Sequence, residues 1–206
     1  MPRSSQFWDR HAAGYARRPV EDETAYQEKL AKTQGYLKPD MDVLELGCGT
    51  GTTSINHAPF VRHIRAIDIS ANMLAIARDK AAAAHVTNVT FEQSNIEDLK
   101  TTDASYDVVM GHSILHLLED REAVIAKVYK MLKPGGIFVT STSCLGGRLP
   151  LLKVILPIGR YFGLLPLVNF FTVEEHMEDL TGAGYRIDYQ WQPGKTKAVF
   201  IIAAKG

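Results

Sequence analysis

The sequence predicts an α/β fold, a largely parallel sheet with helices on both of its faces. Segments of strand composition alternate with helical segments between residues 43 and 141, a pattern typical of parallel strands joined by crossover helices. Two further strand segments near the C-terminus are joined by the short turn Pro193-Gly194. Strands joined by so short a turn must be antiparallel, so the predicted sheet is mixed and ends in a hairpin.

The predicted elements follow one another with clear boundary signals. Pro19 separates the first two helices, and Pro39-Asp40 forms a turn before the first strand. Ser70 is a capping residue at the start of the fourth helix, and Lys133-Pro134-Gly135-Gly136 ends the fifth. The predicted helices span residues 5–17, 21–37, 52–58, 70–85, 120–132 and 173–182. The predicted strands span residues 43–46, 63–68, 89–93, 106–111, 137–141, 185–190 and 198–203.

Composition and charge narrow the class of protein. The 206 residues are 46% apolar, and 23 basic residues balance 23 acidic ones. A neutral chain lacks the broad basic surface that binds a phosphate backbone, so we expect no nucleic-acid partner. Cys48 and Cys144 imply no disulfide framework, and the N-terminus lacks an apolar signal segment, so we expect a cytoplasmic protein.

A long apolar stretch, residues 149–171, raises the question of a membrane span. It contains Lys153, Arg160 and three prolines, which makes it a poor transmembrane helix. We therefore expect no transmembrane segment, while peripheral contact with a membrane stays open.

A glycine-rich loop, Gly47-Cys48-Gly49-Thr50-Gly51, follows the first predicted strand. Glycine allows positive φ angles and close approach of the backbone to a ligand, and the next helix points free N–H groups over the loop. This chemistry suits a nucleotide-like or carboxylate-bearing ligand; the alternative is a tight turn without a ligand. Thr52 stands where a dinucleotide site needs its third glycine, and no phosphate-loop Gly-Lys follows. The spacing therefore disfavours a nicotinamide-dependent oxidoreductase.

Asp68 ends the second predicted strand. A carboxylate at this point can accept hydrogen bonds from both ribose hydroxyls of an adenosine ligand. The alternative is a helix N-cap or turn role, but Ser70 already occupies the capping position. We expect Asp68 to hold a ribose.

Five short segments occur in a characteristic order, at residues 45–51, 66–74, 95–99, 106–109 and 132–136. Together they resemble the class I S-adenosylmethionine-dependent methyltransferases. Residues 7–16 look like the lid helix of small-molecule members, especially the quinone-biosynthesis and phospholipid methyltransferase groups. The resemblance implies S-adenosyl-L-methionine as cofactor and a Rossmann-like, doubly wound, seven-stranded mixed sheet with an antiparallel last strand and a helical lid.

The same resemblance implies a division of one methyltransferase domain into four parts. Residues 1–38 would form the lid helices and residues 39–145 the cofactor-binding core. Residues 145–171 would be an apolar insertion, and residues 172–206 a C-terminal helix and β-hairpin.

The resemblance also implies the residues that bind the cofactor. Gly47, Cys48 and Gly49 would contact its methionine and sugar, with Glu45 beneath the loop orienting the amino group. The family more often has aspartate where Asn95 borders the adenine. Tyr15 would approach the cofactor carboxylate or close the site; the alternative is an aromatic side chain packed on the core. The full set is Tyr15, Glu45, Gly47, Cys48, Gly49, Gly51, Asp68, Ile69, Met73, Asn95, Ile96, Gly111 and His112.

His112 and His116 are the candidate catalytic residues. They are four positions apart, so on a helix they would share a face near the end of the fourth strand. Imidazole titrates near neutrality and can act as a base when the methylated atom loses a proton. His116 is the preferred base; the alternative is that both histidines only line the pocket or cap a helix. No carboxylate cluster of the metal-dependent members is matched, so we expect no metal.

The insertion at residues 145–171 is longer than a simple strand–helix connection and is cut by Pro150, Pro157 and Pro166. Because it follows the carboxyl end of a strand, we expect it to overhang the ligand crevice. It would be an apolar lid over the substrate, or else a dimer contact or extra core. We therefore expect methyl transfer to the oxygen, nitrogen or carbon of a small hydrophobic molecule. The alternative function is a cofactor-binding scaffold without turnover, and monomer and homodimer both stay open.

Overall fold

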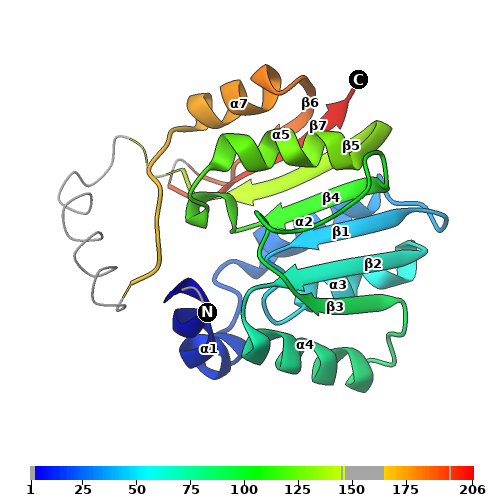
Figure 1. The fold of residues 1–206 in the computed structure, drawn as a ribbon, viewed down its shortest axis with the longest axis vertical. Helices are drawn as coiled ribbons and strands as arrows, with labels where there is room; N and C mark the ends of the chain where they lie inside the picture. The colour runs from blue at the N-terminus through cyan, green and yellow to red at the C-terminus, as the bar shows by residue number, and fades with distance from the viewer. Residues whose placement is uncertain (1–2, 145, 147–164, 195) are drawn as a thin grey trace.

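The seven predicted strands all form, and they join into one sheet in the order β3-β2-β1-β4-β5-β7-β6. The computed structural model describes residues 3–144, 146, 165–194 and 196–206 (Figure 1). Pairs from β3 to β5 are parallel, whereas β7 runs antiparallel to both β5 and β6. The prediction of a mixed sheet with an antiparallel last strand is confirmed.

The bounds of the elements agree closely with the sequence prediction. The strands are β1 (Asp42–Leu46), β2 (His63–Asp68), β3 (Val89–Gln93), β4 (Tyr106–His112), β5 (Leu132–Thr142), β6 (Tyr185–Trp191) and β7 (Val199–Lys205). The α-helices are α1 (Arg3–Ala16), α2 (Glu23–Gln34), α3 (Thr52–His57), α4 (Ala71–Ala83), α5 (Arg121–Met131) and α7 (Val173–Gly182). Short 3-10 helices are η1 (Ala58–Phe60) and η2 (Leu115–Leu117).

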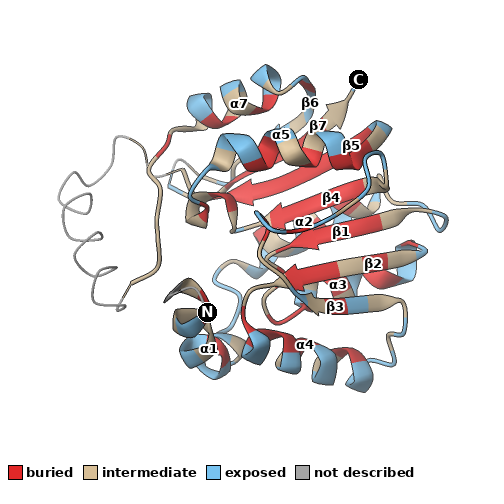
Figure 2. Ribbon diagram, in the orientation of Figure 1, coloured by how far each residue is buried: buried red, intermediate tan, exposed pale blue. Residues whose placement is uncertain are grey.

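Two hydrophobic cores lie on opposite faces of the sheet. On one face Leu44 and Val109 pack with Ile125 of α5, in a cluster that also contains Leu180 of α7. On the other face Val43 belongs to the cluster that contains Leu74, Ala77 and Ala81 of α4. Neighbouring residues of one strand thus point to opposite cores, and the central strands are buried on both faces (Figure 2). This is the doubly wound arrangement that the sequence predicts.

The start of β5 differs from the prediction. The strand was expected at residues 137–141 but begins at Leu132, directly after α5. Leu132 pairs with Tyr106, the register shifts between Tyr106 and Val108, and the Lys133 ammonium donates to Asp107 Oδ2 at 2.7 Å. The Pro-Gly-Gly segment is therefore held beside β4 as part of the strand instead of forming a separate turn.

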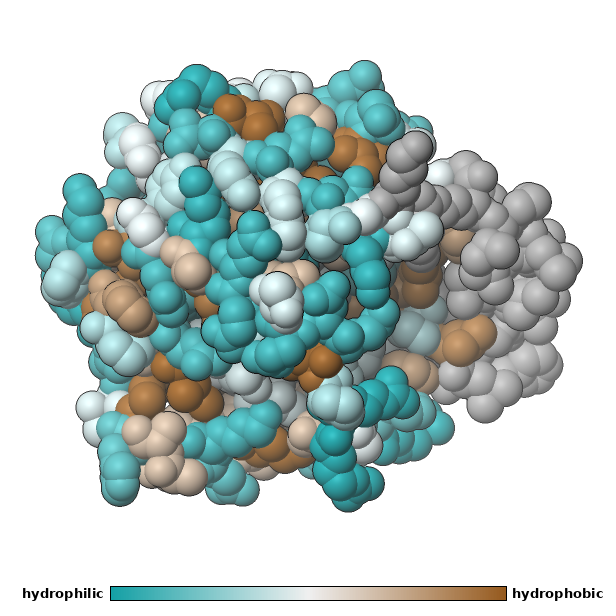
Figure 3. Space-filling view, turned by 180° about the vertical axis from the view of Figure 1, so that it is seen from behind, coloured by the Kyte–Doolittle hydropathy of each residue, from teal (hydrophilic) through white to brown (hydrophobic). Residues whose placement is uncertain are grey.

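The carboxyl ends of the parallel strands meet at one edge of the sheet, where α1 also lies (Figure 1). Most of the predicted insertion, including Pro150 and Pro157, lies outside the described residues, but residues 165–171 are described and reach the same edge. Seen from behind, the surface is mainly hydrophilic with scattered hydrophobic patches (Figure 3). Within the described ranges, no helix is long and apolar enough to cross a membrane.

Candidate functional site

A cavity of about 610 Å³ opens at the carboxyl edge of the sheet. It brings together residues that follow β1, β2, β3 and β4 with side chains of α1 and of residues 165–171. The predicted site residues that line it are Tyr15, Gly47, Gly49, Asp68, Ile69, Met73, Asn95, Ile96, His112 and His116. Glu45, Cys48, Gly51 and Gly111 do not line it. The cofactor-contacting roles of these residues stay predictions.

The glycine loop adopts the left-handed backbone that its sequence anticipates. Gly47, Gly49 and Gly51 have φ angles of 64°, 53° and 74°. A Cβ on Gly47 would lie 2.8 Å from Ile114 Cδ1, and a Cβ on Gly51 would lie 2.8 Å from the Ala77 Cβ. A Cβ on Gly49 would meet only Tyr15, at 3.9 Å. Gly47 and Gly51 therefore serve close packing, whereas Gly49 leaves the space that a ligand needs to approach the backbone.

The Asp68 carboxylate is held by two backbone N–H groups. Gly49 N–H donates to its Oδ2 at 2.9 Å, and Ser70 N–H donates to its Oδ1 at 2.8 Å. Burial raises the pKa of Asp68, while these hydrogen bonds oppose the shift. Each oxygen keeps a further lone pair, so the carboxylate is fixed in orientation and can still accept from a ligand.

The side chains of Glu45 and Cys48 are buried and do not line the cavity. Glu45 is 2% exposed, and its carboxylate accepts a short hydrogen bond from the Ser54 hydroxyl. Burial raises the pKa of Glu45 to about 7. Burial also raises the pKa of the Cys48 thiol, which therefore stays protonated and is a poor nucleophile.

Helix α1 is tied to the start of α4 through Asp9, a contact that the sequence prediction missed. Asp9 Oδ1 accepts from the Ser70 hydroxyl at 2.7 Å and from Asn72 N–H at 3.1 Å. The Asn72 side-chain amide donates to the Asp9 carbonyl at 3.1 Å. A carboxylate is favourable at a helix N-terminus, which carries partial positive charge. Only the capping signal of Ser70 could have suggested this contact.

Two aromatic residues of α1, Trp8 and Tyr15, also line the cavity. Their rings pack edge to face with centroids 6.4 Å apart. Tyr15 is 47% exposed, so it does not pack in the core, the alternative considered for it. Its ring lies next to Gly49, with Cε1 3.9 Å from the position that a Cβ on Gly49 would take.

His112 and His116 do not share a helix face, and that expectation is wrong. His112 is the last residue of β4, while His116 lies in the 3-10 helix η2. Between them Ser113 has a φ of 55°, which redirects the chain after the strand. Both side chains still reach the cavity.

The two histidines differ in their surroundings. Nε2 of His112 is buried and has no hydrogen-bond partner among the described residues. Burial, with His57 and Lys29 nearby, lowers the pKa of His112 to about 3. His116 Nδ1 lies 3.3 Å from Thr142 Oγ1, and burial lowers its pKa. Both imidazoles are neutral at pH 7, but the low pKa of His112 makes it much the weaker base of the two.

The part of the cavity away from the glycine loop, which we call the apolar half, has several apolar side chains in its lining. Its lining includes residues 166–168 and two leucines of the loop after β4, Leu117 and Leu118. Glu97 and Glu119 also line the cavity, and no Lys or Arg does so among the residues that the structure describes. Within the same part of the chain, no group of three His, Cys, Asp or Glu side chains could hold a metal ion.

Comparison with known proteins adds independent information. The family model described as "Methyltransferase domain" matches residues 37–161. Phosphoethanolamine N-methyltransferase 2 of Caenorhabditis elegans is 32% identical over 109 residues, 52% of this chain and 25% of that protein. The malonyl-acyl-carrier-protein O-methyltransferase of Bacillus cytotoxicus is 38% identical over 102 residues, 48% of this chain and 34% of that protein. The chain thus spans less than half the length of these relatives.

Solved structures share the fold at lower identity. An S-adenosylmethionine-dependent methyltransferase from Mesorhizobium loti superposes with a TM-score of 0.73 at 21% identity, covering 89% of this chain and 99% of that one. The 4+2 cyclase SpnF superposes with a TM-score of 0.74 at 17% identity, covering 91% and 83%. These likenesses concern the fold alone.

We predict that Gly51→Ala lowers the free energy of unfolding more than Gly135→Ala does. Both glycines have a φ of 74°, so each alanine should cost about 1–2 kcal/mol of left-handed strain. A Cβ at Gly135 meets nothing within 4 Å, whereas a Cβ at Gly51 meets Ala77 and Phe91 at 2.8 Å. Overpacking should therefore add about 1–3 kcal/mol at Gly51. Urea unfolding of the two variants measures the difference, and equal losses would contradict the packing argument.

We predict that Glu45 makes stability fall as the pH rises. Its folded pKa of about 7 exceeds the value of about 4.3 in an unfolded chain. Its stabilising contribution is therefore complete below about pH 4.3 and lost as the pH rises through 7, a change on the order of 3 kcal/mol. Denaturant titrations from pH 4 to 8 should show Glu45→Gln losing this dependence, whereas Glu122→Gln, on exposed α5 surface, should keep it. Parallel profiles for wild type and Glu45→Gln would refute the assignment.

Proposed function

The chain belongs to the methyltransferase-domain family, whose cofactor is S-adenosyl-L-methionine, and we propose that it transfers a methyl group from this cofactor to a small apolar molecule. One observation carries the proposal: a single cavity joins the glycine loop and Asp68 to an apolar half, with His116 lining the same space. Cofactor and acceptor can therefore meet inside one enclosure, which supplies the proximity that this reaction needs.

The residues present suit the cofactor. Gly49 leaves open space above the loop, and the oriented Asp68 carboxylate offers acceptors for the ribose hydroxyls. Ile69, Met73 and Ile96 give apolar contacts for the adenine, and the side chain of Asn95 can both donate and accept at its edge. When bound, the cofactor supplies an electrophilic methyl group on a positively charged sulfur.

His116 is the best candidate for a base. With Nδ1 directed to the Thr142 hydroxyl, Nε2 is left for the substrate. His112 is the second candidate, because it lines the same cavity, but its pKa of about 3 makes it the weaker base. A neutral imidazole would take the proton from an attacking hydroxyl or amine, or from a methylated carbon; a tertiary amine, which has no proton to lose, would need no base.

The acceptor is proposed from the lining of this cavity and not from any one relative. The relatives and neighbours are named for phosphoethanolamine, malonyl-acyl carrier protein and geranyl diphosphate, so family membership alone selects no acceptor. The apolar half of the cavity favours a molecule with a hydrophobic body next to the methylated atom.

The alternative is a cofactor-binding scaffold without turnover. It is favoured by one observation, that a protein named as a 4+2 cyclase has the same fold. Incubation with a metabolite extract and a cofactor labelled in its methyl group separates the two functions. Labelled product supports the transferase, and cofactor binding without product supports the scaffold.

We predict that Asp68→Asn weakens binding of S-adenosyl-L-methionine by about 10- to 100-fold, because hydrogen bonds to a charged group contribute about 1.5–3 kcal/mol. Isothermal titration calorimetry measures the dissociation constant. Asp103→Asn, at an exposed turn position, is the matched control and should bind like wild type. Unchanged affinity in Asp68→Asn would reject the ribose role, and binding of NAD in place of the cofactor would reject the proposed function.

We predict that His116→Ala lowers kcat/KM by about 10²- to 10⁴-fold on an acceptor that loses a proton, with cofactor affinity unchanged. His63→Ala, at the opposite end of the sheet, should retain full activity. The assay follows labelled product with the acceptor isolated from the extract. Full turnover of His116→Ala on a hydroxyl or amine acceptor would exclude it as the base.

A further inference from the structure

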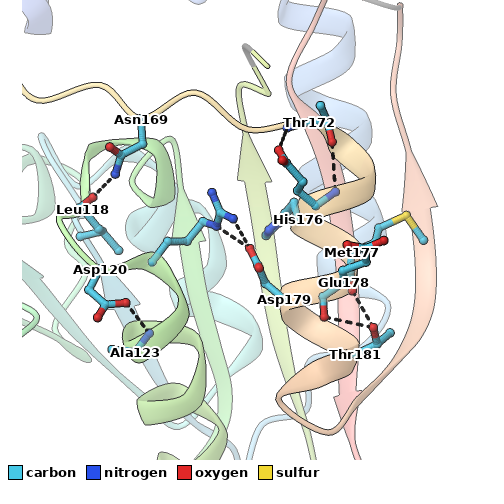
Figure 4. A network of polar contacts seen from close by, with 12 residues as sticks. Leu118, Asp120, Ala123, Asn169, Thr172, His176, Met177, Glu178, Asp179 and Thr181 are labelled. Atoms are coloured by element: carbon cyan, nitrogen blue, oxygen red, sulfur yellow. Dashed lines mark hydrogen bonds and ion pairs between the residues drawn. The ribbon is translucent and has the colours of Figure 1, made fainter. Parts of the chain in front are cut away.

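Two threonines of β5 face the same side of the sheet, and each of them meets a histidine. Thr140 Oγ1 lies 3.2 Å from Nε2 of His176, which projects from α7 toward the sheet (Figure 4). Thr142 Oγ1 lies 3.3 Å from Nδ1 of His116 in η2. Side chains two residues apart on a strand point to the same face, so the two pairs are alike in construction. They differ in the ring nitrogen that the threonine contacts.

One of these two pairs reaches the cavity. His116 is part of the described lining, whereas Thr140 and His176 are not. His176 is 0% exposed, and its Nδ1 is buried without a hydrogen-bond partner among the described residues. The contact of Thr140 with Nε2 thus leaves the other nitrogen of His176 inside the core. At His116 the threonine contacts Nδ1 instead, so Nε2 is the nitrogen left for a molecule in the cavity.

Both members of the cavity pair are held in place by backbone contacts. Thr142 is 0% exposed and is the last residue of β5, where it pairs with Val199 of β7. A β-branched side chain has few rotamers, so the Thr142 hydroxyl has little freedom to move. The Asn169 N–H donates to the His116 carbonyl at 2.7 Å. The Asn169 side-chain amide donates a short hydrogen bond to the Leu118 carbonyl, which fixes the chain on the other side of η2 (Figure 4).

The hydrogen bond at Nδ1 decides where His116 keeps its lone pair. Burial lowers the pKa of His116, so its ring is neutral at pH 7 and has one N–H and one unprotonated nitrogen. The partner of one ring nitrogen determines which of the two carries the proton. If Nδ1–H donates to Thr142 Oγ1, the lone pair lies on Nε2. If the hydroxyl donated to Nδ1, Nε2 would carry the proton and could not act as a base.

We propose that Thr142 is a positioning residue, which accepts a hydrogen bond from Nδ1–H of His116 and so keeps the lone pair on Nε2 for acceptors that present a hydroxyl or an amine N–H. This inference rests on the proposed function and deepens it by naming the kind of acceptor atom. Thr142 is not part of the described cavity lining; it acts through the orientation and the tautomer of His116.

The proton transfer that this arrangement serves takes place at Nε2. The bond between the acceptor atom and its proton breaks, and a bond from that proton to Nε2 forms. The electron pair stays on the acceptor atom, which uses it toward the methyl carbon. His116 becomes an imidazolium with an N–H at both nitrogens. Because Thr142 Oγ1 already accepts from Nδ1, this hydrogen bond persists and becomes charge-assisted, and no other proton has to move.

Nuclear magnetic resonance of the full chain with isotope-labelled histidine tests the proposal, because protonated and unprotonated ring nitrogens differ widely in chemical shift. The sequence has seven histidines, and the signals of His116 are those missing from His116→Gln. Wild type at pH 7 should carry the His116 proton on Nδ1, with and without S-adenosylhomocysteine. Thr142→Val, which has a similar shape and no hydroxyl, should raise the share of the Nε2–H tautomer about 3- to 10-fold, the effect of one hydrogen bond. Thr142→Ser should restore the wild-type signals.

Thr140→Val is the matched control. It removes an equally buried hydroxyl from the same face of β5, so it should lower stability to a similar extent and change the signals of His176, but leave those of His116 unchanged. Transfer of labelled methyl from the cofactor into a metabolite extract should fall about 3- to 10-fold in Thr142→Val. It should recover in Thr142→Ser and stay at the wild-type rate in Thr140→Val. All three variants should bind S-adenosylhomocysteine like wild type by calorimetry.

The proposal is overturned if wild-type His116 carries its proton on Nε2, or if Thr142→Val changes neither the tautomer nor the transfer of label. It is also overturned if Thr140→Val changes both as much as Thr142→Val does. The wild-type spectrum and Thr142→Ser decide the question if Thr142→Val does not fold. Failure of wild type to bind S-adenosylhomocysteine or to transfer label would instead overturn the proposed function, and the spectra would still show whether Thr142 sets the tautomer.

Discussion

The carboxylate of Asp68 joins four parts of the molecule through a short series of hydrogen bonds. It accepts from Gly49 of the glycine loop and from Ser70 at the start of α4. Ser70 in turn caps α4 and donates its hydroxyl proton to Asp9 of α1. The loop, the end of β2, α4 and α1 therefore keep one mutual arrangement. The shape of the cavity beside the glycine loop depends on this series, because the space at Gly49 stays open only while the loop is held in place.

Patterns among neighbouring residues explain how much of the fold and of the candidate site could be predicted from the sequence. The strands are short runs of apolar residues, glycines mark the positive φ angles, and Ser70 has the residue type of a helix cap, so the fold and the cofactor half follow from neighbouring residues. The hydrogen bonds of Asp9 with Ser70 and of Asn169 with Leu118 could not be predicted, because the partners are 61 and 51 residues apart in sequence. Such contacts depend on how whole elements pack, and no local pattern encodes them.

The error about His112 and His116 has a similar origin. Spacing alone suggests one helix face, but β4 continues through His112, and Ser113 then adopts a left-handed conformation uncommon outside glycine. Both side chains reach the cavity by a different backbone path. The apolar part of the cavity wall is also formed by segments far apart in sequence, because residues 166–168 and the loop after β4 meet only in the folded chain. The glycine loop and its positive φ angles thus follow from local sequence, whereas this part of the wall depends on tertiary contacts.

The junction at Gly146 has an evolutionary consequence. Its N–H donates to the Phe171 carbonyl at 2.7 Å, and a Cβ there would lie 2.6 Å from the Phe171 carbonyl carbon, so the chain closes on itself at this point. The segment between Gly146 and Phe171 therefore begins and ends at two residues that are hydrogen-bonded to each other. Because doubling the length of a closed loop costs only about 0.6 kcal/mol, the intervening stretch can be lengthened, shortened or exchanged with little effect on the sheet. We therefore infer that the length of the segment between Gly146 and Phe171 can change while the sheet and the glycine loop keep their arrangement.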